Sequence, residues 1–255
     1  MTDRTLKVTT ALVLAGSRGG PDPVALSEGL PHKALARIGN ETMLGRVVAA
    51  LREAGCERVL VSTDIPEVVA LAVLLGTEVV RPGAGPSESV ARAFETTGAP
   101  LLVTTADHPL LAPDWIHRLI AGSPETADVS IMLARQVDVE TALPGNRRTW
   151  LRFADGGWSG CNLFLLSTPT AARALGGWRE VEAERKHPWR LARRLGWRTL
   201  FDYGFGRLGM ADAIARLGGR LGVRATLVPA LDGLAAVDVD KIDDLLLVRR
   251  LIESR

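Results

Sequence analysis

Short apolar runs alternate with longer amphipathic runs through the first half of the chain. Runs rich in Val, Leu and Thr predict buried strands at 9–16, 57–63, 77–82 and 100–107. Apolar positions at helical spacing predict helices at 42–55, 66–76, 87–98 and 112–122. Thr42 and Gly55 are the expected N-cap and C′ residues of the first helix, and Ser87 is the expected N-cap of the third. The alternation is typical of βαβ units, so it predicts a mainly parallel sheet with helices on both faces.

The pattern changes after about residue 128. We expect a strand at 128–136, two strands within 149–167 joined at Asp155-Gly156-Gly157, and a last strand at 224–230. Three helical patterns follow the paired strands, and a final helix closes the chain. No internal repeat or linker interrupts residues 1–255. The prediction is one α/β domain, a three-layer α/β/α sandwich with a mixed, mainly parallel sheet, whose second half (136–255) is elaborated on the first (1–135).

Composition narrows the class of protein. Hydrophobic residues make up 47% and charged residues 24% of 255 residues, which is typical of a globular domain. A formal net charge of +2 does not indicate a nucleic-acid binder. Cys56 and Cys161 lack the spacing of a zinc site or a disulfide framework. Because the sequence contains neither a signal peptide nor an apolar run long enough to span a bilayer, we expect a cytoplasmic location.

The stretch "LVLAGSRGG" (12–20) leads from the first expected strand directly into a glycine-rich turn. Its spacing matches neither the G-x-G-x-x-G of dinucleotide-binding folds nor the G-x-x-x-x-G-K-[ST] of phosphate loops. Such a turn exposes backbone N–H groups and favours an anion beside it. A purely structural turn also uses glycine, so the motif alone leaves the ligand open.

Two charged residues accompany this turn. Lys33 in "LPHKAL" is either solvated or a point charge for a phosphate. Asp107 ends the expected strand "PLLVTTAD", where a carboxylate either caps a turn or binds a hard cation such as Mg²⁺. Ligands of open parallel sheets bind beyond the carboxyl ends of the strands. The glycine turn and Asp107 are therefore expected at one ligand-binding edge.

Together these segments resemble a known family. "LAGSRGG", then "HKAL", then the helix "MLGRVVAALREAG" and the strand "ERVLVST" are similar to the MobA-like nucleotidyltransferases. The resemblance covers residues 9 to about 135 and returns at "VDVDKIDDLLLVRRL" near the end of the chain. Two features depart from the family pattern: Ser17 replaces a glycine, and "PDPVALSEGLP" lengthens the connection to Lys33.

The resemblance implies a Rossmann-like GT-A fold and a Mg²⁺-dependent transfer of NMP from an NTP to a phosphorylated acceptor, with release of pyrophosphate. The acceptor would be a sugar, polyol or cofactor phosphate. Arg18 and Lys33 would act on the phosphates, and Asp107 and Asp240 would hold Mg²⁺, with Asp238 as the alternative second ligand. The residues implied in binding the nucleotide and the acceptor are Leu14, Ala15, Gly16, Ser17, Gly19, Gly20, Ser87, Ser89 and Asn162.

Several alternatives stay open from the sequence. Asp238-Val239-Asp240 also fits the D-x-D metal motif of a GT-A glycosyltransferase, although Arg18 and Lys33 argue for a triphosphate. The acidic residues could instead cap the last helix, and the serines could cap theirs. A non-catalytic nucleotide-binding protein on the same fold is a further alternative.

A basic segment in the second half has no place in these motifs. Residues 184–197 place Arg185, Lys186 and Arg190 around Trp189. They could bind the phosphate of an acceptor, contact a membrane surface peripherally, or form the solvated face of a helix. The expected partners are an NTP and a small phosphorylated acceptor, without nucleic acid, in a monomer or homodimer.

Overall fold

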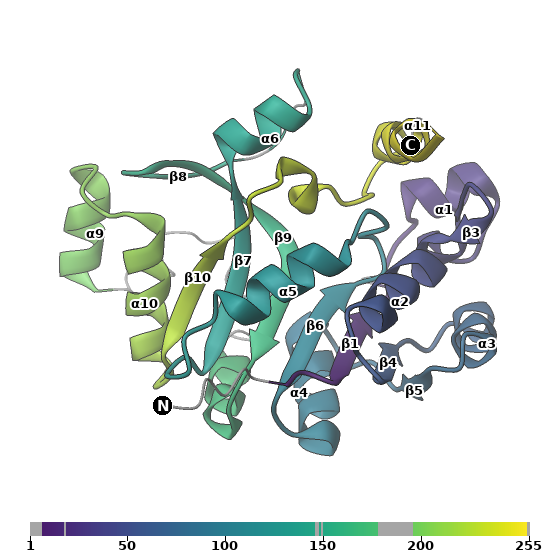
Figure 1. Ribbon diagram of the computed structural model, residues 1–255, viewed down its shortest axis with the longest axis horizontal. Coiled ribbons are helices and arrows are strands. Elements are labelled where there is room, and N and C mark those ends of the chain that lie inside the picture. Colours follow the sequence, from purple (N-terminus) through teal and green to yellow (C-terminus); the bar gives the residue numbers. More distant parts are fainter. Residues whose placement is uncertain (1–6, 18, 146–147, 149, 178–195, 254–255) are drawn as a thin grey trace.

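The computed structural model describes residues 7–17, 19–145, 148, 150–177 and 196–253. An eight-stranded sheet runs through it in the order β10-β7-β9-β6-β1-β4-β5, with β8 paired to β9 (Figure 1). All strands of this path are parallel except β9, which is antiparallel to β6 and β7. The strands of this sheet are β1 Thr10–Leu14, β4 Arg58–Ser62, β5 Glu78–Val80, β6 Leu101–Thr105, β7 Val129–Arg135, β8 Leu151–Phe153, β9 Gly156–Leu166 and β10 Ala225–Pro229. The predicted mixed, mainly parallel sheet is confirmed.

Helices cover both faces of this sheet (Figure 1). They are α1 Pro23–Glu28, α2 Met43–Glu53, α3 Pro66–Leu74, α4 Pro86–Thr97, α5 Pro113–Ala121, α6 Gln136–Ala142, α9 Trp197–Gly204, α10 Met210–Arg220 and α11 Ile242–Glu253. Residues 172–177 are also helical. Short 3₁₀ turns occur at η1 Lys33–Leu35, η2 Pro169–Ala171 and η3 Gly233–Ala236, and β2 Arg37–Ile38 pairs with β3 Glu41–Thr42.

The alternation of side chains along the strands separates the core into two layers. In β1, Ala11 and Val13 pack with residues of α2, α5 and α11, whereas Leu12 packs on the opposite face with residues of α4. Successive side chains of a strand point to opposite faces, so apolar runs such as "ALVL" are buried on both sides. The predicted three-layer α/β/α sandwich is confirmed.

Two of the helix boundaries test the predicted caps. The Thr42 hydroxyl accepts a hydrogen bond from the Gly45 N–H (3.0 Å), and Gly55 follows the helix with φ 93°, so both caps of α2 are confirmed. The cap predicted for Ser87 is wrong, because α4 already begins at Pro86 and has Gly85 as its N-cap residue. Proline favours the first helical position, since it lacks the N–H that would stay unpaired there.

The segment between the glycine turn and Lys33 contains a helix that the sequence pattern did not predict. Asp22 caps α1 by accepting hydrogen bonds from the Val24 and Ala25 N–H groups (2.9 and 3.0 Å). Glu28 at its end pairs with Arg249 of α11 (2.6 Å). The lengthened connection is therefore an ordered element that packs on the last helix.

The antiparallel strand β9 connects the two halves of the fold. The hairpin before it turns at Ala154-Asp155, and Gly156 pairs with Phe153 as a strand residue, so the predicted three-residue turn is corrected. The pairing of β9 with β7 shifts register between Ile131 and Leu133. Asn162 lies in this bulge and adopts φ 48°, the only non-glycine residue with positive φ in the described part of the chain.

Candidate functional site

Lys33 lies at the centre of a charged cluster at the carboxyl ends of the strands. Its ammonium group donates to Asp107 Oδ2, Asp240 Oδ1 and the Val239 carbonyl, each at 2.8 Å. The Lys33 and Asp107 side chains are 15% and 19% exposed, whereas that of Asp240 is 63% exposed. Residues 33, 107 and 240, which the sequence places far apart, therefore meet at one point.

Backbone hydrogen bonds hold these residues in place. β6 ends at Thr105, and the Asp107 carbonyl accepts from the Val239 N–H (2.8 Å), which ties the C-terminal loop to the end of the strand. His32 caps the turn that carries Lys33, since its Nδ1 accepts from the Ala34 N–H (3.1 Å). The approach of the ammonium to both carboxylates is thus set by backbone as well as by charge.

Charge pairing keeps Lys33 and Asp107 ionised. Burial lowers the pKa of Lys33, but the nearby charges of Asp107 and Asp240 outweigh it and leave that pKa above its ordinary value. Burial likewise raises the pKa of Asp107, yet the Lys33 ammonium outweighs it and leaves the pKa lowered. Asp107 Oδ1 is buried and has no hydrogen-bond partner among the described residues.

Asp238 belongs to a second pair beside the first. Its Oδ1 accepts from Arg148 Nη2 (2.8 Å) and its Oδ2 accepts from Asn162 Nδ2 (3.2 Å). Burial raises the pKa of Asp238, Arg148 opposes the rise, and Asp107 and Asp240 add to it. Arg148 was not singled out from the sequence, because its partners lie about ninety positions further along the chain.

The alternative that Asp240 caps the last helix finds no support in the hydrogen bonds. Asp244 is the carboxylate that accepts from the Asp240 and Lys241 N–H groups (3.2 and 3.0 Å). The Asp240 side chain instead accepts from Lys33. The Asp240 side chain therefore does not cap the last helix.

The glycine turn lies at the same edge. A Cβ on Gly16 would contact Pro82 at 3.6 Å, which places the turn beside the loop before α4. Gly19 and Gly20 have φ values of 76° and 101°, a region that favours glycine. The Ala15 N–H continues the strand pairing by donating to the Ser62 carbonyl (3.0 Å), so it does not face a ligand.

The other predicted residues are distributed as follows. Ser87 and Ser89 are buried at the start of α4, and the Ser89 hydroxyl accepts from the Gly83 N–H and donates to the Gly85 carbonyl (both 2.9 Å). This loop therefore uses Ser89 to fix its own shape. Leu14 ends β1, and the exposed Ser17 follows in the turn. Arg18, the basic residues Arg185, Lys186 and Arg190, and Trp189 lie outside the described residues.

His108, next to Asp107, carries no charge at neutral pH. Its ring is buried and stacks on Trp115 with centroids 5.7 Å apart. Burial lowers the pKa of His108 to about 4, so the ring is neutral. The charged groups named here, Lys33, Asp107, Asp240, Asp238 and Arg148, pair with one another instead.

The donor set of the cluster fits a hard divalent cation. Two aspartates, one with the buried and unpaired Oδ1, offer oxygen ligands of the kind that Mg²⁺ prefers. Within the described ranges, no group of three or more His, Cys, Asp or Glu could hold a metal by itself. Asp107 and Asp240 are the carboxylates that would hold such an ion.

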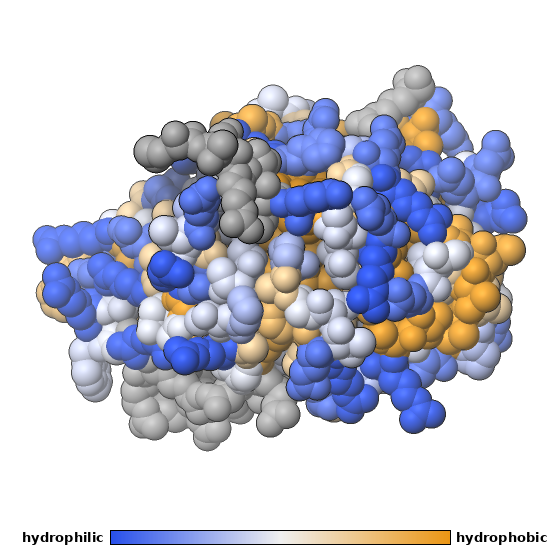
Figure 2. Space-filling view, turned by 60° about the horizontal axis from the view of Figure 1, so that its bottom comes forward, coloured by the Kyte–Doolittle hydropathy of each residue, from blue (hydrophilic) through white to orange (hydrophobic). Residues whose placement is uncertain are grey.

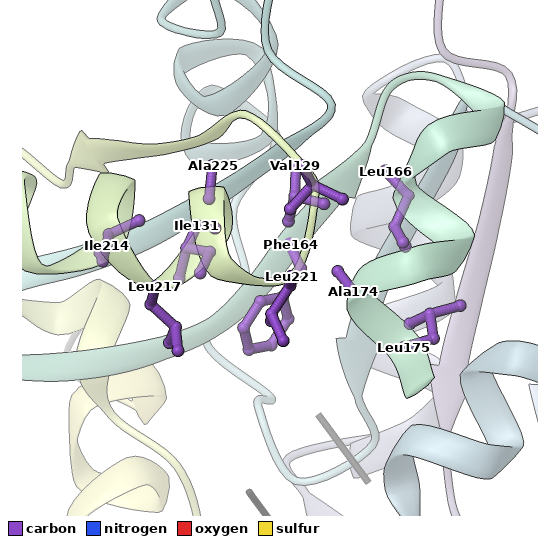
Figure 3. A pocket seen from close by; sticks show the side chains of 12 residues that line it. Val129, Ile131, Phe164, Leu166, Ala174, Leu175, Ile214, Leu217, Leu221 and Ala225 are labelled. Carbon is purple, nitrogen blue, oxygen red and sulfur yellow. The ribbon is translucent and has the colours of Figure 1, made fainter. Parts of the chain in front are cut away.

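An apolar cavity lies elsewhere in the fold. It has a volume of about 210 Å³ and is lined by β7, β9, α10 and residues 174–175, with Ile131, Phe164 and Leu217 pointing into it (Figure 3). Val129 and Leu166, at the opposite ends of their strands from the charged cluster, also line it. None of its lining residues is charged, so this cavity offers nothing to a phosphate.

The outer surface adds a further contrast. Figure 2 shows hydrophobic side chains gathered at its right, the side on which α3 lies in Figure 1, where Val73 and Leu74 are exposed. Within the part of the chain that the structure describes, no helix is both long and apolar enough to cross a membrane.

The chain is similar to known proteins. Residues 11–227 match the family of MobA-like NTP transferase domains. The bifunctional protein GlmU of Gluconobacter oxydans is 30% identical over 141 residues, which are 54% of this chain and 30% of that protein. A 3-deoxy-manno-octulosonate cytidylyltransferase of a Chelativorans species is 36% identical over 110 residues, 40% of this chain and 43% of that one. The chain thus spans less than half the length of these curated relatives.

A solved structure covers far more of the chain. A hypothetical transferase from Thermus thermophilus superposes with a TM-score of 0.80 at 30% identity, over 94% of this chain and 100% of that one. The likeness therefore includes the second half as well as the glycine turn.

Proposed function

Because the chain belongs to the family of MobA-like NTP transferase domains, we propose that it transfers a nucleoside monophosphate from an NTP to a phosphorylated acceptor. The observation that carries this proposal is Lys33, held at 2.8 Å from both Asp107 and Asp240 at the edge that also carries the glycine turn. In the reaction, an acceptor phosphate oxygen forms a bond to the α-phosphorus, the bond to the β-phosphate oxygen breaks, and pyrophosphate leaves.

Lys33 is the proposed catalytic cation. Two carboxylates stabilise its charge, and three hydrogen bonds fix the position of its ammonium group. On substrate binding it exchanges at least one carboxylate for the α-phosphate, where it stabilises the charge that grows during attack. Since an acceptor phosphate is already ionised at neutral pH, no general base is needed.

The glycine turn is the proposed cradle of the triphosphate. The positive φ of Gly19 and Gly20 and the exposure of the turn support backbone contacts to the phosphates, with Arg18 adding charge. The loop 82–86 beside Gly16 would extend this wall towards the nucleoside. Ser89 would serve it by fixing the shape of this loop, while contact of Ser87 or Ser89 with the nucleoside stays a prediction. Asn162, which contacts Asp238 from the bulge of β9, stays the residue predicted for the acceptor side.

Asp107 and Asp240 are the proposed Mg²⁺ ligands. When bound, the ion supplies positive charge that neutralises the phosphates and lowers the barrier to attack by an anionic oxygen. The chain's own contribution is the fixed carboxylate pair, whose geometry Val239 and Lys33 maintain.

The glycosyltransferase alternative has less support. A D-x-D site would use Asp238 and Asp240 together on one ion, but Asp238 accepts from Arg148 and Asn162 while Asp240 accepts from Lys33. The two carboxylates thus have separate partners, and Asp240 shares Lys33 with Asp107.

One screen tests which nucleotide base the NTP carries and which phosphorylated acceptor the protein uses. The protein is incubated with Mg²⁺, each of the four NTPs and a panel of sugar, polyol and cofactor phosphates, and pyrophosphate release is measured. CTP enters first because one relative is described as a cytidylyltransferase. We expect one NTP to raise the melting temperature in the presence of Mg²⁺ and at least one acceptor to release pyrophosphate.

Failure of the screen has a clear meaning. If no acceptor releases pyrophosphate and no NTP shifts the melting temperature, the transferase proposal is wrong. If an NTP stabilises the protein but every acceptor fails, a non-catalytic nucleotide-binding role replaces it.

A further inference from the structure

Arg148 contacts two residues of the loop that carries Asp240. Its Nη1 donates to the Ala236 carbonyl, and its Nη2 donates to Asp238 Oδ1 at 2.8 Å. Nη1 also lies 3.3 Å from the Ser159 hydroxyl of β9. Arg148 therefore joins the loop before β8, the strand β9 and the segment 236–238. A planar guanidinium suits such simultaneous contacts better than a flexible ammonium.

Asn162 approaches the same carboxylate from the opposite oxygen. Its amide donates to Asp238 Oδ2 at 3.2 Å. Its backbone lies in the left-handed region, which residues other than glycine adopt uncommonly. A left-handed residue in a β-bulge re-aims its side chain, and such strain persists where the surrounding structure demands it. Both oxygens of Asp238 are thus engaged by β9 and by the loop at Arg148.

The neighbouring residues of the segment are held by the charged cluster instead. Val239 and Asp240 accept from Lys33, and the Val239 N–H donates to Asp107. In the proposed reaction Lys33 turns to the phosphate, so its hold on the segment weakens at the moment when Asp240 must stay opposite Asp107. The contacts of Arg148 and Asn162 do not involve Lys33 and persist through this exchange.

We propose that Arg148, with Asn162, is a positioning residue that acts through Asp238 to keep the Asp240 carboxylate in place for the metal–nucleotide complex. This inference rests on the proposed function, because the position of Asp240 matters only if it serves a bound NTP. It also gives Asp238 a role distinct from that of a metal ligand.

The test measures binding without turnover. Mn²⁺ replaces Mg²⁺, and binding of its complex with the NTP selected in the screen is followed by the enhancement of water proton relaxation, with no acceptor present. We expect Arg148→Ala to weaken binding about tenfold, as loss of a group that orients a metal ligand does. Arg148→Lys should recover part of the affinity, because it restores one donor to Asp238.

A double-variant cycle tests the route through Asp238. If Arg148 acts through this carboxylate, the double variant binds with the same affinity as Asp238→Ala within about threefold, because Arg148→Ala removes nothing further once Asp238 is gone. Arg216→Ala is the matched control: it breaks another arginine–aspartate pair, to Asp202 at 2.7 Å between α9 and α10. We expect it to bind like the wild type.

The outcomes separate this inference from the function beneath it. If the wild type does not bind Mn²⁺ with any NTP, the proposed function fails and the inference fails with it. If the wild type binds and Arg148→Ala binds equally well, or if the effects of Arg148→Ala and Asp238→Ala multiply, only the inference is wrong. Should Arg148→Ala melt below the assay temperature, Asp238→Asn, which keeps the shape of the side chain, replaces it with the same expected direction.

Discussion

Two regions of one central sheet carry opposite kinds of chemistry: the carboxyl edge of its parallel strands, at β6, and their amino edge, at β7 and β9. At the carboxyl edge, Asp107 follows β6 and meets Lys33 and Asp240 within hydrogen-bonding distance. At the amino edge, Val129 and Leu166 line a cavity of about 210 Å³ without a charged side chain. This apolar cavity is thus not the candidate site. The volume of a cavity reflects how side chains pack, whereas binding of a phosphate depends on charged groups and unpaired polar atoms.

The edges also differ in what they do for stability. Burying Lys33 and Asp107 carries a desolvation cost that their attraction offsets only while both partners are present. The aliphatic residues at the other edge stabilise the fold simply by leaving water. Substitutions at the carboxyl edge should therefore change activity most, and those at the amino edge should change stability alone.

Lys33→Ala should have the largest effect. Loss of the cation that faces the developing charge is expected to lower kcat/KM for pyrophosphate release by about 10²–10³-fold. Circular dichroism at the assay temperature checks that the variant is folded, and Arg216→Ala serves as the remote control. Unchanged activity in folded Lys33→Ala would show that the site is assigned wrongly.

Leu166→Ala should separate the edges most clearly. Leu166 is 2% exposed and lines the cavity, so truncation enlarges it and lowers the free energy of unfolding by about 2–5 kcal/mol. Denaturant unfolding gives the loss, and kcat/KM should match the wild type wherever the variant is folded. Leu246→Ala on the exposed side of α11 should change stability by less than about 0.5 kcal/mol. A large drop in kcat/KM for Leu166→Ala would mean that the edges are coupled.

Asp128 supplies a pH-dependent contrast within the amino edge. It accepts from the Thr168 hydroxyl (2.6 Å) and the Arg224 N–H (2.8 Å). Burial raises its pKa, but these hydrogen bonds outweigh burial and leave the pKa below its ordinary value of 3.8. The folded state therefore binds this proton less readily than the unfolded state, and the stabilisation is present above pH 3.8 and lost as pH falls through the folded pKa.

Asp128→Asn should consequently destabilise by about 1–2 kcal/mol at pH 7, through weaker hydrogen bonds. The gap to the wild type should narrow as pH falls below 3.8, which unfolding curves at pH 7, 4 and 3 would measure. A gap that widens with acid would contradict the sign.

Filling the cavity should have the smallest effect. Ala174→Met adds a flexible apolar side chain to its lining and is expected to raise the free energy of unfolding by about 1 kcal/mol without changing kcat/KM. Ala211→Met, at an exposed position of α10 outside the lining, is the control. If Ala174→Met destabilises the protein and Ala211→Met does not, the cavity is too small for the added side chain.

The sequence predicted most of the sheet because apolar runs buried on both faces report strands directly. It also predicted Lys33, Asp107 and Asp240 as site residues, since a resemblance related positions that no local pattern connects. The sequence did not predict Arg148 as a site residue, because a single arginine in a loop cannot be told from a solvated surface charge. Its meaning depends on Asp238, which only the folded chain brings near.

Two local errors have simple physical causes. Helix α1 is too short for a helical period to be recognised, and its Asp22-Pro23 start reads equally well as a turn. In α4, the serine pattern suggested a cap, whereas Pro86 starts the helix one residue earlier. The bulge at Asn162 depends on the register of β9 against β7, which pairing between distant strands decides.

The hydrogen bond from the Val239 N–H to the Asp107 carbonyl has a consequence for biosynthesis. The glycine turn, Lys33 and Asp107 leave the ribosome long before Val239 and Asp240. Until then Lys33 has only one of its two carboxylates. A nascent chain can thus assemble the triphosphate side of the site early, but the set of residues proposed for transfer is complete only after the segment with Val239 and Asp240 has been made.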